Sequence, residues 1–146
     1  NNILKKALNK IVIPDYYHTR EYDLIEIVGA NPLSNDKNKT VHSTNHWKHS
    51  DGTHAMYGNS KKLEIPLSSD YNIYELIWTN DKMETKINGV SFHVIDIKSG
   101  VVNETFTKPF FFILNIAVGG NWPGPPNDET QFPQKMYVDY IRVYPN

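Results

Sequence analysis

The chain has 146 residues, of which 39% are hydrophobic, with a formal net charge of −1 and no cysteine. This length and hydrophobic content are enough for a single domain with a buried core. The near-neutral charge and the lack of a long basic run argue against nucleic acids and anionic membranes as partners, and the lack of cysteine excludes disulfides and thiolate chemistry.

The first 20 residues carry a helix-like pattern. Ile3, Leu4, Leu8 and Ile11 fall at spacings that fit one face of a helix, which Pro14 would end. We therefore predict a short helix before the first strand. The segment lacks the layout of a signal peptide, and because the chain begins with Asn rather than Met we expect a trimmed or processed start.

From residue 21 onward the pattern is that of strands, because runs rich in β-branched and aromatic residues alternate with turn residues. The predicted strands are 21–28, 39–44, 71–79, 82–87, 90–97, 110–117 and 135–144. Asn88-Gly89 between two of them favours a tight hairpin, since both turn positions need positive φ. The apolar run 110–118 is too short for a membrane helix. Strands at this spacing predict an all-β, two-sheet jelly-roll sandwich.

The stretch 45–60 is rich in His, Gly, Ser and Asn and is predicted to be a loop that forms one wall of a binding cleft. Histidines at 42, 46, 49 and 54 also raise the alternative of a zinc or copper site. Their spacing matches no standard zinc motif and no thiolate is available. A cleft wall is therefore the favoured interpretation.

Three acidic residues, Glu21, Asp23 and Glu26, form the main chemical motif. In a regular strand Glu26 would point away from Glu21 and Asp23, but a β-bulge between Asp23 and Glu26 brings all three to one face. Such crowding favours protonation of one acid beside an ionised one. Retaining glycoside hydrolysis needs this pair, about 5 to 5.5 Å apart. Glu21 fits the nucleophile and Glu26 the acid/base, with Asp23 holding a proton between them; the alternative is an acidic strand that merely faces water.

The pattern Glu21-x-Asp23-x-x-Glu26, followed by Val28-Gly29, resembles the catalytic signature of glycoside hydrolase family 16 in the bulged form of its laminarinase-like members. Further blocks follow in family order at 40–42, 74–82, 87–89, 109–124 and 132–144. The last two blocks most resemble endo-β-1,3-glucanases. The resemblance divides the chain into an unmatched segment, 1–20, and a catalytic β-sandwich of concanavalin-like type, 21–146.

The resemblance implies that Glu21 is the nucleophile, Asp23 the supporting carboxylate and Glu26 the acid/base. It implies endo-acting, retaining cleavage of a β-1,3-glucan or a mixed-linkage β-glucan, without a required cofactor. Because such polysaccharides lie outside cells, we expect a secreted or periplasmic protein.

Four residues are candidates for binding the sugar: His42, Trp47, Asn115 and Trp122. The histidine matches one that lies near the sugar in the family, the tryptophans offer apolar planes for stacking, and the amide is suited to bond a hydroxyl. Each also fits a structural role, as a buried histidine, a core tryptophan or a buried amide. Asp139 corresponds to a calcium position in many members, although the other oxygen ligands are not evident here.

The sequence also departs from the family pattern, because family members carry several strands before the catalytic one and only 20 residues precede Glu21. The sandwich is then incomplete on its N-terminal side and would expose sheet edges and apolar surface. We expect these to be covered by a missing N-terminal half, a second chain, self-association or the segment 1–20. A non-catalytic β-glucan-binding protein or an inactive fragment is the alternative to an enzyme, but the intact acids favour the enzyme.

Overall fold

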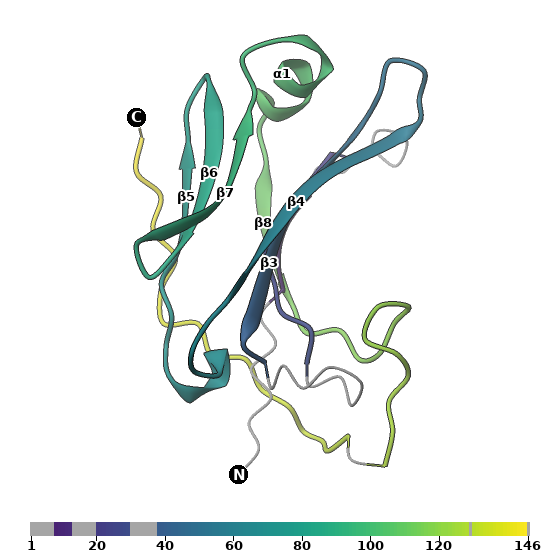
Figure 1. Ribbon diagram of the computed structural model, residues 1–146, viewed down its shortest axis with the longest axis vertical. Coiled ribbons are helices and arrows are strands. Elements are labelled where there is room, and N and C mark those ends of the chain that lie inside the picture. The colour runs from purple at the N-terminus through teal and green to yellow at the C-terminus, as the bar shows by residue number, and fades with distance from the viewer. Residues whose placement is uncertain (1–7, 13–19, 30–37, 129, 146) are drawn as a thin grey trace.

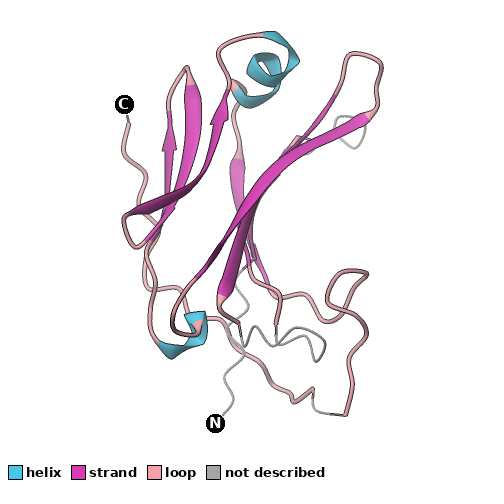
Figure 2. Ribbon diagram, in the orientation of Figure 1, coloured by secondary structure: helices cyan, strands magenta, loops and turns pink. Residues whose placement is uncertain are grey.

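The structure is a computed structural model that describes residues 8–12, by their backbone, and residues 20–29, 38–128 and 130–145 (Figure 1). Most of the regular structure is β-strand (Figure 2). The strands are β1 (Leu8–Val12), β2 (Glu21–Glu26), β3 (Thr40–Lys48), β4 (His54–Lys62), β5 (Tyr74–Trp78), β6 (Lys82–Ile87), β7 (Val90–Asp96) and β8 (Phe111–Asn115). The helices are a 3₁₀ turn, η1 (Leu67–Ser69), and α1 (Gly100–Phe106).

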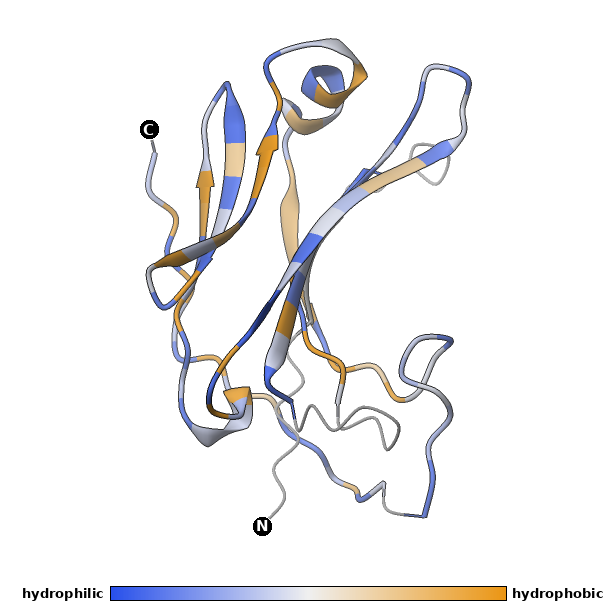
Figure 3. Ribbon diagram, in the orientation of Figure 1, coloured by the Kyte–Doolittle hydropathy of each residue, from blue (hydrophilic) through white to orange (hydrophobic). Residues whose placement is uncertain are grey.

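The strands form two antiparallel sheets that lie as two layers in Figure 1. The larger sheet has the order β4-β3-β2-β1-β8 and the smaller one the order β5-β6-β7. Hydrophobic and hydrophilic residues alternate along the strands (Figure 3), as expected when one face of each sheet is buried. The predicted all-β jelly-roll sandwich is confirmed.

The core lies between the two sheets and draws apolar side chains from both. Its buried members include Tyr22, Ile25 and Val41 from the larger sheet and Met83, Ile87 and Ile95 from the smaller one. Phe106 of α1 is fully buried and closes one end of the core. Burial of this apolar surface is the main stabilising term for the sandwich.

A hydrogen-bonded polar cluster is buried inside this core. The Tyr22 phenol bonds Thr85 Oγ1, and Ser43 Oγ lies 3.2 Å from the phenol oxygen and 3.0 Å from Thr85 Oγ1. His93 Nε2 donates to Asn45 Oδ1 at 2.6 Å, since the amide oxygen only accepts. Burial raises the pKa of Tyr22, which keeps the phenol protonated. The cluster therefore joins β2 and β3 to the smaller sheet through neutral groups.

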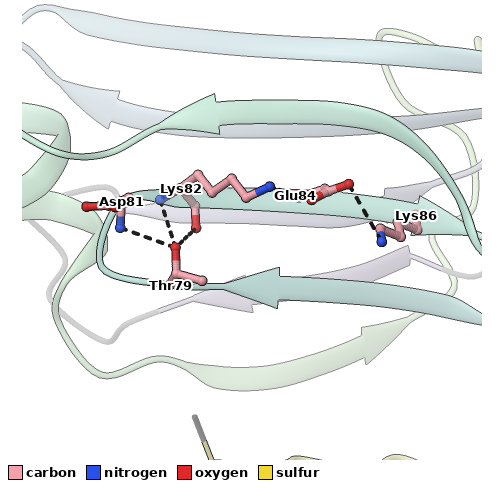
Figure 4. Close-up of polar contacts among 5 residues, drawn as sticks. All are labelled: Thr79, Asp81, Lys82, Glu84 and Lys86. Atoms are coloured by element: carbon pink, nitrogen blue, oxygen red, sulfur yellow. Dashed lines mark hydrogen bonds and ion pairs between the residues drawn. The ribbon is translucent and has the colours of Figure 1, made fainter.

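Two connections fix the smaller sheet. The predicted Asn88-Gly89 hairpin is confirmed, with φ of 50° and 78° between β6 and β7. Between β5 and β6, Thr79 Oγ1 accepts hydrogen bonds from the backbone N–H groups of Asp81 and Lys82 (Figure 4). Glu84 beyond this turn lies 2.8 Å from the Lys82 ammonium, whose hydrogen bond lowers the pKa of the carboxyl group.

The predicted N-terminal helix is wrong where the structure can test it. Leu8 and Ile11 lie in strand β1, which pairs with β2 on one side and β8 on the other. Ile3 and Leu4 lie outside the described residues. The periodicity fitted a helix, but pairing with two strands overrides such a local preference.

The loop predicted for 45–60 is also wrong. Residues 40–48 and 54–62 form the hairpin β3–β4, joined by a turn in which Asp51 Oδ1 accepts a bond from the Thr53 backbone N–H at 2.9 Å. The strand signal is the alternation of His42 and His46 with Val41, Ser43 and Asn45, all three of which are buried.

The strand predicted for 135–144 is absent, although the segment is described. A strand exists only where its backbone pairs with a neighbour, and here the apolar side chains remain exposed, up to 74% for Tyr144. Helix α1 was not predicted, because its 7 residues span too few turns to give a clear periodicity. No helix of the described part is long and apolar enough to cross a membrane.

Candidate active site

A β-bulge in strand β2 arranges the acidic residues. Glu21 pairs with His46, Asp23 with Thr44 and Glu26 with His42. Asp23 to Glu26 spans three positions on β2, while Thr44 to His42 spans two on β3. The extra residue resets the alternation, so the three acids share one face. The bulge predicted from the sequence is confirmed.

Each acid begins a row of residues that continues across the sheet. In β4, Met56 stands opposite His46, Gly58 opposite Thr44, and Ser60 opposite His42. A Cβ at Gly58 would lie 2.9 Å from Thr44 Oγ1 and 3.0 Å from the Ser43 carbonyl oxygen. Any larger residue at position 58 would therefore displace Thr44 or the backbone of Ser43, so glycine fits the middle row best. Because glycine has no side chain, the sheet surface is lower at this row.

The β3 and β4 members of these rows, with Glu26, line an open pocket with a volume of about 560 Å³, a size typical of ligand sites. Glu21 and Asp23 lie on the same face of the sheet but are not among the lining residues. The lining residues are Glu26, His42, Thr44, His46, Met56, Gly58, Asn59, Ser60 and Trp122. Trp122 comes from the loop after β8 and is 53% exposed. Its ring meets the imidazole of His42 edge-on, with 4.7 Å between centroids. Of the site residues predicted from the sequence, Glu26, His42 and Trp122 line this pocket.

Asp23 lies deeper than a surface carboxylate and is only 3% exposed. Its Oδ2 is 3.2 Å from Nε2 of His46. Its Oδ1 is buried and has no hydrogen-bond partner within the described residues. A buried carboxylate oxygen in this state is a ready acceptor for a proton or for a hydrogen bond from a neighbouring acid.

His46 completes the acidic group and was not among the predicted site residues. The hydrogen bond that His46 donates to Asp23 raises the pKa of His46, burial opposes this, and the charges of Asp23, Glu21 and Glu26 add to the increase. A cationic His46 would offset part of the repulsion among the three acids. The residue was missed because 45–60 was interpreted as a loop. Its spacing of four from His42, an even number on a strand, was the available signal.

The other predicted binding residues do not line this pocket. Trp47 points to the opposite face of β3 and contacts Phe106, with 6.3 Å between ring centroids. Asn115 is exposed at the end of β8, and β1 lies between β8 and strand β2, which carries the acids. A sugar contact by either residue stays a prediction.

The calcium role of Asp139 stays a prediction. Asp139 is exposed in the segment without strand structure. In the described ranges no group of three His, Cys, Asp or Glu side chains is arranged to hold a metal ion. Of the four histidines weighed as a zinc site, His46 and His54 contact each other, but they bond ring to ring.

Comparisons with known proteins show the family of the chain. The sequence model of "Glycosyl hydrolases family 16" matches residues 12–142. The chain therefore belongs to glycosyl hydrolase family 16. The match begins at residue 12, within the segment 1–20 that was predicted to be unmatched.

Individual relatives cover only part of their own length. The chain is 38% identical to the clotting factor G alpha subunit of Tachypleus tridentatus over 75% of this chain and 16% of that protein. It is 33% identical to a beta-glucanase of Rhodothermus marinus over 85% of this chain and 44% of that protein. The solved catalytic domain of an endo-1,3-beta-glucanase (laminarinase) from Thermotoga petrophila shares 30% identity, with a TM-score of 0.65, over 87% of this chain and 52% of that structure. The chain thus spans about half of that solved domain.

Proposed function

We propose that this chain carries the catalytic carboxylates of a retaining endo-β-glucanase that cleaves β-1,3-linked or mixed-linkage glucan. The observation that carries the proposal is the bulge in β2, which turns Glu21, Asp23 and Glu26 to the face that lines the pocket. A strand that merely faced water would gain nothing from placing three repelling acids together. Membership of the family supports the same chemistry.

In the proposed first step, the Glu21 carboxylate attacks the anomeric carbon and Glu26 gives its proton to the departing glycosidic oxygen. The bond from the anomeric carbon to the leaving sugar breaks, and a glycosyl ester forms on Glu21. In the second step, Glu26 takes a proton from water, whose oxygen displaces the ester. The sugar is released with its original configuration, and both acids return to their starting states.

Asp23 and His46 serve both steps by controlling charge and orientation. The contact of 3.2 Å with His46 holds one oxygen of Asp23 and leaves Oδ1 to accept a hydrogen bond from a neighbouring acid. A carboxylate fixed on both sides cannot rotate away as the proton is transferred. Asp23 therefore acts as a support for the acids on either side of it.

The pocket suits a neutral sugar. Trp122 and Met56 present apolar surface, which matches the C–H faces of a pyranose. His42 and Ser60 add hydrogen-bonding groups beside Glu26. The same pocket could hold glucan without cutting it, because the chain spans about half of the related solved domain. Since glucans lie outside cells, the proposal includes export from the cytoplasm.

The test is reducing-sugar release from soluble β-1,3-glucan by the protein and by Glu21→Gln and Glu26→Gln variants. We expect a loss of about 10⁴-fold or more for Glu21→Gln. Glu26→Gln should keep activity on an aryl glycoside whose leaving group needs no proton, and Glu21→Gln should not. Glu75→Gln, exposed on the other sheet, is the matched control. Glucan binding without sugar release by the unmutated protein would replace the enzyme with a binding protein.

A further inference from the structure

We propose that His54 is a positioning residue that holds the imidazole of His46 against Asp23. The inference rests on the proposed function, because it assigns a role within the same acidic group. His54 is the first residue of β4 and does not line the pocket. Its influence on the acids therefore passes through His46.

The geometry places three polar groups in a chain. Nε2 of His54 lies 3.0 Å from Nδ1 of His46, and Nε2 of His46 lies 3.2 Å from Oδ2 of Asp23. The two imidazole planes differ by 16°, with 5.2 Å between centroids. In the register of β3 and β4, His54 stands opposite Lys48, so it reaches His46 diagonally. Each end of the His46 ring thus has a fixed partner.

Hydrogen-bond rules show why an imidazole suits this position. An ionised carboxylate only accepts, so Nε2 of His46 carries a proton toward Asp23. When His46 is neutral, its Nδ1 accepts a bond from Nε2–H of His54. When His46 is cationic, Nδ1–H donates and Nε2 of His54 accepts as the other tautomer. His54 can keep the same contact in both charge states of His46, which a side chain that only donates cannot do.

The surroundings of His46 make this constancy useful. The acids that face it are Glu21, Asp23 and Glu26 of β2, with His54 on β4 and with His42 and Lys48 on the same face of β3. The proton of His46 is therefore sensitive to the state of the acids, which changes during the proposed reaction. A ring that turned whenever its charge changed would release Asp23.

Two variants separate positioning from mere packing. His54→Phe keeps a ring beside His46 but removes both hydrogen-bonding functions. His54→Gln keeps a donor and an acceptor on a different frame. Because His54 is exposed at the start of a strand, neither change should prevent folding, which thermal unfolding would verify. Glucan hydrolysis is measured as kcat and KM, and the titration of His46 is followed by NMR.

We expect His54→Phe to lower kcat about 10-fold and to leave KM within about 2-fold of its value in the unmutated protein. A loss of this size is typical when a residue that orients a catalytic group is removed. The pKa of His46 should fall in this variant, because a freely rotating ring loses its bond to Asp23. His54→Gln should restore most of both properties. An unchanged His46 titration in His54→Phe, or equal damage in His54→Gln, would overturn the positioning role.

The NMR readout does not depend on activity. One outcome is that the unmutated protein releases no sugar, while the pKa of His46 is still lowered in His54→Phe and restored in His54→Gln. The positioning contact then stands and the proposed glucanase function fails. If sugar release is normal and the His46 titration is the same in all three proteins, the glucanase function stands and the positioning role fails.

Discussion

Two histidines on opposite faces of the β2–β3 ladder respond to the same fold in opposite ways. His46, on the pocket face, has its pKa raised by the hydrogen bond that it donates to Asp23. His93, from β7 on the core face, is fully buried, bonds the neutral amide of Asn45, and has its pKa lowered to about 4 by burial. The two pKa values move in opposite directions because an acidic partner outweighs burial at His46, whereas burial acts without such a partner at His93.

The β-bulge is what allows the two faces to differ so sharply. It turns Glu26 to the same side as Asp23 and sends Leu24 and Ile25 into the core. The pocket face thereby collects groups that change charge. The core face keeps groups such as the Tyr22 phenol, which burial holds in its neutral form. The pair of strands β2 and β3 thus carries ionisable side chains on its pocket face and buried, neutral polar groups on its core face.

Among the tests of this comparison, the largest effect is expected from a substitution on the pocket face. Asp23→Asn should lower kcat/KM for β-1,3-glucan by about 10²- to 10³-fold, or about 3 to 4 kcal/mol, because the amide cannot take a proton from a neighbouring acid. The pKa of His46 should fall, since its main raising contact is lost. Steady-state kinetics and NMR titration measure both. Asp81→Asn, at an exposed position in the turn between β5 and β6, is the control, and an unchanged pKa of His46 would contradict the assignment.

The next effect tests the core side through the pH dependence of stability. His93 has a folded pKa of about 4, below its ordinary value of 6.5. The unfolded chain therefore binds the proton more readily. The contribution of neutral His93 to the free energy of unfolding should be fully present above pH 6.5 and should fall as the pH drops toward 4. The total loss from this site should be at most about 3 kcal/mol.

Removing the ionisable group should remove this loss. His93→Gln retains a donor for Asn45 and should unfold with little dependence on pH from this site between pH 6.5 and 4. Denaturant unfolding at several pH values in both proteins measures the difference. An acid loss of the same size in His93→Gln would show that other groups cause it.

The acids and one hairpin were predictable because their signals are local. The spacing of Glu21, Asp23 and Glu26 contains the bulge, since one extra residue is what brings a third acid to the face. Asn88-Gly89 specifies its own turn through positive φ. In both cases, neighbouring residues decide the outcome.

The parts that the sequence did not reveal depend on distant partners. Whether 54–62 is a loop or a strand depends on pairing with β3. Whether 135–144 is a strand depends on a neighbouring strand, and none pairs with it among the residues that the structure describes. The contact of His46 with Asp23 needs the register of β3 on β2, which no local pattern gives. The partner of His93 was hidden for the same reason, because Asn45 lies on the other sheet.

The smallest expected effect concerns His46 on the pocket face and is measured, as for His93, by the pH dependence of the free energy of unfolding. The folded pKa of His46 is raised above 6.5, so the stability from its contact with Asp23 is fully present below pH 6.5 and is lost as the pH rises through the folded pKa. His46→Gln should therefore destabilise the protein more at pH 6 than at pH 9. The side chain is 21% exposed and water screens the pair, so we expect less than about 1 kcal/mol. Denaturant unfolding at these two pH values checks it, with Glu75→Gln, exposed on the smaller sheet, as the control. A loss that grew with pH would mean that the Asp23 contact does not favour the cation, and the two histidines would no longer differ in sign.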